Sequence, residues 1–300
     1  MFSRIQTRYF RSLKAVDQLL VPVQALGGPN ASGKTTFLDV LGLLSDLVRN
    51  RGDVRETIQS RSASFDKLIW QGPGEDKGQR GGFQIAVEAP IPESVRARMA
   101  DDKRQFTTVR YEIEIGFDAS TNEIGLDHET LWLRASGEDQ ISVQKDMFPM
   151  VPEDAPSIFV GTSKRGFKVV MKKTPGGNDN YYTEGAKSYA PSFRLGRTKL
   201  GLAHIPADEA SFPVSSWFRD MLEKGVQNVV LNSQIIRQPS PPGLGLRFQS
   251  NGSNLPWVVA ELRRDTQRFA DWLEHVRTAL GDIEDIDSIE RDDDRHRYLV

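Results

Sequence analysis

Residues 28–36 limit what this chain can fold into more than any other segment does. They fit the pattern G-x-x-x-x-G-K-[ST], whose fixed positions are Gly28, Gly33, Lys34 and Thr35. This spacing lets a short loop wrap a phosphate group with its backbone N–H groups just before a helix begins. In such a loop the lysine contacts the β- and γ-phosphates of ATP, as a binding and catalytic residue, and the threonine hydroxyl holds Mg²⁺. The predicted ATP-binding residues are Gly28, Pro29, Asn30, Ala31, Ser32, Gly33, Lys34, Thr35 and Thr36.

Both flanks of the loop agree with this interpretation. Residues 19–26 predict a short buried strand, although Pro22 weakens its first half. After the loop, a helix is predicted up to residues 50–52, where Asn-Arg-Gly stops the pattern. Its apolar residues recur at helical spacing and are Phe37, Leu38, Val40, Leu41, Leu44, Leu47 and Val48. The alternative, a glycine-rich turn without a ligand, does not account for this order of strand, loop and helix.

Composition sets the outer bounds of the fold. The chain has 300 residues, of which 38% are hydrophobic, and this suits one large domain or two ordinary ones. It has no cysteine, so disulfides and thiolate metal sites are excluded. No apolar run approaches the ~20 residues that cross a bilayer, and the first residues lack the apolar core of a signal peptide. We therefore expect a cytoplasmic protein with no membrane partner.

The pattern of elements predicts an α/β fold with two parts, residues 1–202 and 203–300. A first strand at residues 5–10 precedes the loop, and β-rich segments follow at residues 82–87, 109–117, 130–133, 140–143 and 167–171. We expect an antiparallel sheet beside the nucleotide site, with residues 111–115 as a half-exposed strand because their apolar and acidic residues alternate. From residue 203 the chain is mainly helical, with helices at 213–223 and from about 255 to 276. Ser253 or Asn254 suits the cap of the second helix, and Pro256 suits its first turn.

The net charge of −2 conceals a local excess of basic residues. Between residues 160 and 203 the sequence has two acidic residues, Asp179 and Glu184, and nine basic ones. The basic residues are Lys164, Arg165, Lys168, Lys172, Lys173, Lys187, Arg194, Arg197 and Lys199. This stretch is either an ordinary solvated face or a surface that meets a polyanion such as DNA.

Two segments carry a resemblance to a known family. Residues 5–13, together with the loop at 28–36, resemble the opening of the ABC-type ATPases of the RecF, SMC and OLD group. Residues 251–256, Asn-Gly-Ser-Asn-Leu-Pro, resemble the "DGSNL" turn of stand-alone predicted ATPases in that group, several of which belong to anti-phage systems. The resemblance implies a P-loop NTPase head that binds ATP and Mg²⁺. It also implies a homodimer with ATP between two heads, and a DNA or an effector partner such as a nuclease or toxin.

The same resemblance assigns individual residues. Gln71 matches the glutamine that senses Mg²⁺ and the attacking water, and is therefore a candidate catalytic residue; its alternative is an ordinary polar loop residue. Arg11 matches a position near the nucleotide. Ala31 stands where the family usually has glycine, and a positive φ at this position would cost about 1 kcal/mol.

Hydrolysis in this group needs a strand of four apolar residues followed by Asp-Glu, the Walker B motif, and the sequence has no clear match. The nearest candidates are Glu88, the pair Asp208 and Glu209, and Glu261, and each lies in an unsuitable context. The "SGG" or "SDG" signature of relatives is also missing. We therefore expect the front portion of a longer ATPase, without the second half of its nucleotide-binding core, and slow hydrolysis. The four histidines are scattered without the spacing of metal ligands.

Two classes of function remain at this stage. The first is an ATP-driven switch in DNA-related or anti-phage processes, in which nucleotide joins two heads and the pair engages DNA or an effector. The second is a non-hydrolysing, nucleotide-sensing scaffold. A small-molecule P-loop kinase is less favoured, because such kinases rarely carry an antiparallel sheet of this extent.

Overall fold

The computed structural model describes residues 1–72, 81–136, 157–161, 164–174, 176–187 and 189–300. The chain divides into two compact units, Met1–Val226 and Gln227–Val300. This division differs from the expected boundary at residue 203. Residues 203–226 belong with the first unit because Phe212, Val214, Phe218 and Leu222 are buried in its core.

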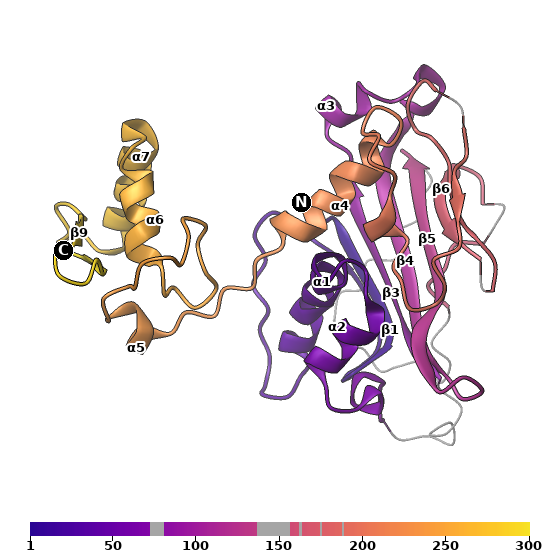
Figure 1. Cartoon of the computed structure of the whole chain (residues 1–300), viewed down its shortest axis with the longest axis horizontal. Coiled ribbons are helices and arrows are strands. Elements are labelled where there is room, and N and C mark those ends of the chain that lie inside the picture. The colour runs from indigo at the N-terminus through magenta and orange to yellow at the C-terminus, as the bar shows by residue number, and fades with distance from the viewer. Residues whose placement is uncertain (73–80, 137–156, 162–163, 175, 188) are drawn as a thin grey trace. The chain divides into compact units, whose positions relative to one another are not determined.

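An antiparallel sheet is the framework of the first unit (Figure 1). Among the described residues, eight strands pair in the order β2-β1-β3-β4-β5-β6-β7-β8. They are β1 (Arg4–Phe10), β2 (Leu13–Leu19), β3 (Gly82–Pro90), β4 (Phe106–Asp118), β5 (Glu123–Ala135), β6 (Phe167–Lys173), β7 (Asp179–Tyr181) and β8 (Ser192–Phe193). Hydrophobic residues of the central strands face the core at every second position, so the sheet is amphipathic along most of its length.

Helices cover one face of this sheet, with α1, α2 and α4 lying over it in Figure 1. They are α1 (Lys34–Arg49), α2 (Val54–Arg61), α3 (Glu93–Arg96) and α4 (Pro213–Gly225), with short 3₁₀ turns at η1 (Phe65–Leu68), η2 (Asp101–Lys103) and η3 (Leu202–His204). The apolar stripe of α1 is buried in one core with residues of β1 and β3. This packing fixes the direction of α1, and so it positions the loop that precedes the helix.

The second unit has the elements α5 (Ser233–Ile236), α6 (Leu255–Leu262), α7 (Thr266–Ala279), β9 (Ser288–Glu290) and β10 (Arg297–Leu299). Its organising residue is Asn254, whose side chain is fully buried. Asn254 Oδ1 accepts a hydrogen bond from the Gln249 N–H at 2.8 Å, and Nδ2 donates to the carbonyls of Gly245 at 3.0 Å and Arg247 at 2.7 Å. The Asn254 side chain therefore satisfies backbone groups of the loop before α6 and fixes the conformation of this loop.

The predicted strand at residues 19–26 is wrong. β2 ends at Leu19, and residues 20–26 form no regular structure. Val21 is 56% exposed and Val23 is 90% exposed, whereas Leu20 and Leu26 are partly buried against the core. Pro22 lacks the N–H group that a strand needs, and no described strand pairs with this segment.

The other predicted elements of the first unit are confirmed where the structure describes them. Strands β1, β3, β4, β5 and β6 and helices α1 and α4 each cover the expected segment. The expected strand at residues 140–143 lies outside the described residues. Residues 111–115 do alternate, but the expectation that this strand is half exposed is wrong, because Glu112 is fully buried.

The long helix expected from residue 255 is two helices. It is interrupted at residues 263–265, and Asp265 then caps α7 by accepting a hydrogen bond from the Arg268 N–H at 3.1 Å. Asn254 occupies the N-cap position of α6 as expected, but its side chain binds the preceding loop rather than the helix. Val259 and Leu273 are buried, whereas most other apolar residues of this stripe are only partly buried.

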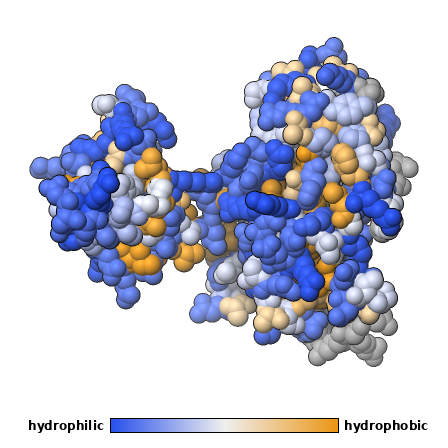
Figure 2. Space-filling model, viewed as in Figure 1, coloured by the Kyte–Doolittle hydropathy of each residue, from blue (hydrophilic) through white to orange (hydrophobic). Residues whose placement is uncertain are grey.

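The face of the molecule seen in Figure 2 is mainly hydrophilic in both units, with apolar residues exposed in scattered spots. Helices of the described residues are all too short or too polar to span a lipid bilayer.

Candidate nucleotide-binding site

The phosphate-binding pattern folds into an exposed loop that leads directly into α1. Gly28 has φ 147° and Gly33 has φ 87°, and residues with a side chain rarely adopt such angles. Ala31 has φ 63°, so the position that takes glycine in the resembling family is left-handed in this chain too. An alanine in this conformation costs about 1 kcal/mol. Both glycines thus adopt angles that favour glycine, and the loop is strained at Ala31.

The N-terminus of α1 is open to a ligand. Gly33 is the N-cap residue and provides no side-chain hydrogen bond, and the first turn of the helix has no acidic residue. The first N–H groups of an α-helix lack partners inside the helix, and they carry the positive end of its dipole. An anion that binds at the start of α1 would therefore meet free N–H groups and a favourable field.

Lys34 lies across the loop. Its ammonium group donates to the carbonyl oxygens of Gly28 and Pro29, both at 2.7 Å. The same ammonium can turn to a phosphate held by the loop, because these carbonyls are exposed and can be hydrated in its place. The hydroxyl of Thr35, an exposed residue in the first turn, is available for Mg²⁺, which would offset phosphate charge when bound. The residues present thus fit ATP with Mg²⁺.

The β1–β2 turn packs against the start of α1. Ser12 Oγ donates to Thr36 Oγ1 at 3.0 Å, and the Arg11 guanidinium pairs with Asp39 at 3.0 Å. Arg61 also pairs with Asp39 at 2.6 Å, so the charge of Asp39 is shared between two arginines. The structure therefore brings Arg11 to the first turns of α1, where its charge is paired with Asp39.

Gln71 follows a short segment that runs beside the same turn. The Arg11 N–H donates to the Leu68 carbonyl at 2.9 Å, and the Trp70 N–H donates to the Tyr9 carbonyl at 2.8 Å. Gln71 itself is exposed, and its side chain donates to the Asp66 carbonyl at 2.8 Å. The position of Gln71 agrees with either of its two interpretations, the water-sensing glutamine or a polar loop residue.

The candidate Walker B carboxylates have other partners. Glu88 is buried on β3, and its carboxylate pairs with Arg110 at 2.7 Å and Arg134 at 3.1 Å. Asp208 accepts from the hydroxyls of Ser211 and Tyr189 in a turn, and Glu209 is exposed. Glu261 lies in α6 and pairs with Arg264 at 2.8 Å. None of these carboxylates stands at the end of a buried strand with a free oxygen.

A buried ionic network on the sheet was not predicted. Arg110 donates to Glu112 at 2.7 Å, Trp132 Nε1 donates to the other oxygen of Glu112 at 2.9 Å, and the Val160 N–H donates to Glu112 at 2.9 Å. Burial alone would raise the pKa of Glu112, but hydrogen bonding by His128 and the charge of Arg110 hold this pKa below its ordinary value. The sequence showed only that acidic residues alternate with apolar ones on this strand. It did not show that Arg110, Trp132 and Val160 surround the Glu112 carboxylate.

Carboxylates pair with part of the basic stretch, and most of them come from other segments. Between residues that the structure describes, four of its basic side chains form ion pairs with carboxylates: Lys168 with Asp102, Lys173 with Asp179, Arg197 with Asp118 and Asp127, and Lys199 with Asp53. Lys172 and Lys173 are adjacent on β6, so they point to opposite faces of the sheet. The sequence count of charges therefore overstates the positive field of this region. Within the described part of the chain, no three His, Asp or Glu side chains are grouped as metal ligands.

Comparison with known proteins identifies the region that contains the loop. Residues 25–150 match the family model described as "AAA domain, putative AbiEii toxin, Type IV TA system". This match supports an AAA-type P-loop ATPase family. It covers the phosphate-binding loop, α1, α2 and the strands β3 to β5, and it agrees with the α/β architecture of this region. No curated protein matches the chain significantly.

Proposed function

We propose that this chain is an ATP-binding head of an ABC-type ATPase that acts as a nucleotide-driven switch. The observation that carries the proposal is the N-terminus of α1, which has no side-chain cap. It follows a loop with Gly28 and Gly33 at positive φ, and the Lys34 ammonium donates to the loop carbonyls. The family match over residues 25–150 supports the ATPase part of the proposal. ATP with Mg²⁺ is the proposed ligand, held by residues 28–36, and Arg11 and Gln71 are the proposed accessory residues.

The switch that we propose has two copies of the chain with ATP between their heads. The closed pair then engages DNA or controls an effector such as a nuclease or toxin, in DNA repair or anti-phage defence. The resemblance of residues 5–13 and 28–36 to the RecF, SMC and OLD group supports this arrangement. The description of the matching family, which names a toxin of a toxin–antitoxin system, favours the effector over DNA.

A second candidate is a nucleotide-sensing scaffold that does not hydrolyse ATP. It is favoured by the engagement of Glu88, Asp208 and Glu261 with other side chains, which leaves none of these three carboxylates placed to orient water. A positioned general base typically contributes ~10²–10⁴-fold to a rate. Both candidates therefore predict slow turnover by this chain, and they differ in what ATP does to its assembly.

The test measures phosphate release and sedimentation of the full chain with ATP, with ADP and without nucleotide. The switch predicts turnover well below 1 s⁻¹ and an ATP-dependent dimer that Lys34→Ala abolishes. Binding of ATP with no change in sedimentation would favour the scaffold. Steady turnover near 1 s⁻¹ that Lys34→Ala abolishes would contradict slow hydrolysis, and Glu88→Gln and Asp208→Asn would then show which carboxylate was overlooked.

A further inference from the structure

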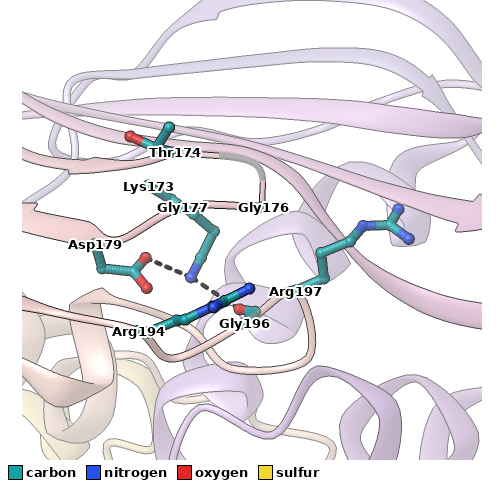
Figure 3. Close-up of a pocket in the computed structure, with 8 residues that line it drawn as sticks. All are labelled: Lys173, Thr174, Gly176, Gly177, Asp179, Arg194, Gly196 and Arg197. Atoms are coloured by element: carbon teal, nitrogen blue, oxygen red, sulfur yellow. Dashed lines mark hydrogen bonds and ion pairs between the residues drawn. The ribbon is translucent and has the colours of Figure 1, made fainter.

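A cavity of the first unit is lined by residues of β6 and β7 and by residues 194–197, away in sequence from the phosphate-binding loop. Its volume is about 200 Å³, and its lining includes three basic residues and one acidic residue (Figure 3). The charged residues of this pocket are Lys173, Asp179, Arg194 and Arg197, and the remaining lining residues are Thr174, Gly176, Gly177 and Gly196. None of the residues that line this pocket belongs to the loop at 28–36, so a ligand bound here would be distinct from the ATP proposed for that loop.

Two of the three basic residues are already balanced. Lys173 is buried and pairs with Asp179, and its ammonium also donates to the Gly196 carbonyl at 3.1 Å. Arg197 pairs with Asp127 and, at 3.1 Å, with Asp118. In Figure 3 the Arg197 side chain points away from Lys173 and Arg194. Lys173 and Arg197 line the pocket, but their positive charges are largely compensated by these carboxylates.

Arg194 differs from its neighbours. It is exposed, and no hydrogen bond or ion pair holds its guanidinium among the residues that the structure describes. Figure 3 shows its side chain beside Lys173 and Gly196, along the edge of the pocket. A guanidinium has five N–H donors in a fixed fork that matches the oxygens of phosphate. Arg194 therefore supplies the uncompensated positive charge and the donors of this site.

The shape of the pocket limits the ligand. Pockets for drug-sized molecules have volumes of ~300–1,000 Å³, so a cavity of about 200 Å³ suits a single phosphate group better than a whole nucleotide. No atom would meet a side chain at Gly176 or Gly196 within 4 Å, so the backbone at both positions borders open space. A small oxyanion can reach the backbone of this rim without displacing a side chain.

We propose that this pocket binds one phosphate group, with Arg194 as the residue that recognises it. The group comes either from a nucleic-acid backbone or from free phosphate, because the pocket chemistry is the same for both. The Lys173–Asp179 pair fixes the side of the pocket that β6 and β7 form. Arg197 connects the pocket to the β4–β5 hairpin through its ion pairs with Asp118 and Asp127.

The test titrates inorganic phosphate into the full chain at constant ionic strength, by calorimetry. All proteins carry Lys34→Ala, so that the phosphate-binding loop contributes least. Arg194→Gln should weaken phosphate binding about tenfold or more, since a charge-assisted bidentate contact is lost. Arg237→Gln is the matched control, because Arg237 is an exposed arginine of the second unit with no described partner. It should bind phosphate as the parent does, and equal melting temperatures would show that all variants are folded.

A second arm distinguishes the two sources of phosphate. Duplex DNA is titrated over a range of salt concentrations, with Lys34 intact. If the source is a nucleic acid, Arg194→Gln lowers the slope of log affinity against log salt by about 1 and Arg237→Gln leaves it unchanged. Unchanged DNA binding with reduced phosphate binding assigns the pocket to free phosphate. Equal phosphate affinities of the Arg194→Gln and Arg237→Gln proteins, or no measurable binding by the parent, would overturn the proposal. Neither result depends on whether the loop at residues 28–36 binds ATP.

Discussion

Replacing Glu184 with glutamine should change how the stability of the first unit depends on pH. The Glu184 carboxyl is fully buried at the start of α4, where it accepts hydrogen bonds from the Val214 N–H and from the N–H and hydroxyl of Ser215. Burial raises the pKa of Glu184 from 4.5 to about 7, although these hydrogen bonds favour its charged form. The folded chain therefore holds a proton in a range of pH in which the unfolded chain has lost it.

The sign of the effect follows from this difference. A raised pKa in the folded state stabilises it fully below pH 4.5, and this contribution is lost as the pH rises to about 7. Each tenfold difference in proton affinity is worth about 1.4 kcal/mol, so the loss is on the order of 3 kcal/mol. In a unit of this size, 1 kcal/mol shifts the melting temperature by about 2–4 °C, which gives a shift of about 6–12 °C.

The assay compares thermal unfolding at pH 5 and pH 8. The natural chain should lose about 6–12 °C more between these two pH values than Glu184→Gln does. The glutamine side chain can also change stability by an amount that does not depend on pH. This amount cancels, because the melting temperature of each protein at pH 8 is compared with its own value at pH 5. Glu209→Gln is the matched control, since Glu209 is exposed, and it should behave as the natural chain does. An identical pH dependence of the natural chain and Glu184→Gln would refute the reasoning.

Three further substitutions test the local geometry by urea unfolding. Ala31→Gly should raise the free energy of unfolding by about 1 kcal/mol, because it removes strain at φ 63°. The control is Ala63→Gly, at an exposed position without a positive φ, and it should lower the free energy of unfolding. Asn254→Ala should destabilise the second unit by about 2–4 kcal/mol, since three buried hydrogen bonds are lost, and Asn228→Ala, at an exposed residue, should have little effect. Phe218→Ala should cost about 3–5 kcal/mol, because the ring is fully buried in the core of the first unit.

The phosphate-binding loop could be predicted from sequence because its chemistry is local. The backbone angles of Gly28 and Gly33 are set by the absence of a side chain, and the following helix has a clear apolar period. The strands β3 to β6 were predictable for the same reason, since each is long enough to show its own pattern.

The errors concern properties that depend on distant residues. Residues 20–26 have the composition of a strand, but a strand also needs a neighbour, and none of the described strands pairs with them. Glu112 alternates as an exposed residue would, yet Arg110 and Trp132 make its burial favourable. Part of the basic stretch is paired with carboxylates far away in sequence, such as Asp53, which pairs with Lys199. Trp132 and Asp53 lie far from their partners in sequence, so no local window contains these two pairs.

Equilibrium binding of a fluorescent ATP analogue tests the central claim most directly, that residues 28–36 hold the phosphates of ATP. Lys34→Ala should weaken binding by about 2–3 kcal/mol, which is about 30–150-fold, because the phosphate charge loses its ammonium partner. Lys67→Ala removes an exposed lysine elsewhere in the first unit and should leave the affinity unchanged. Equal affinities of the natural chain and Lys34→Ala would contradict the assignment of this loop as the nucleotide site.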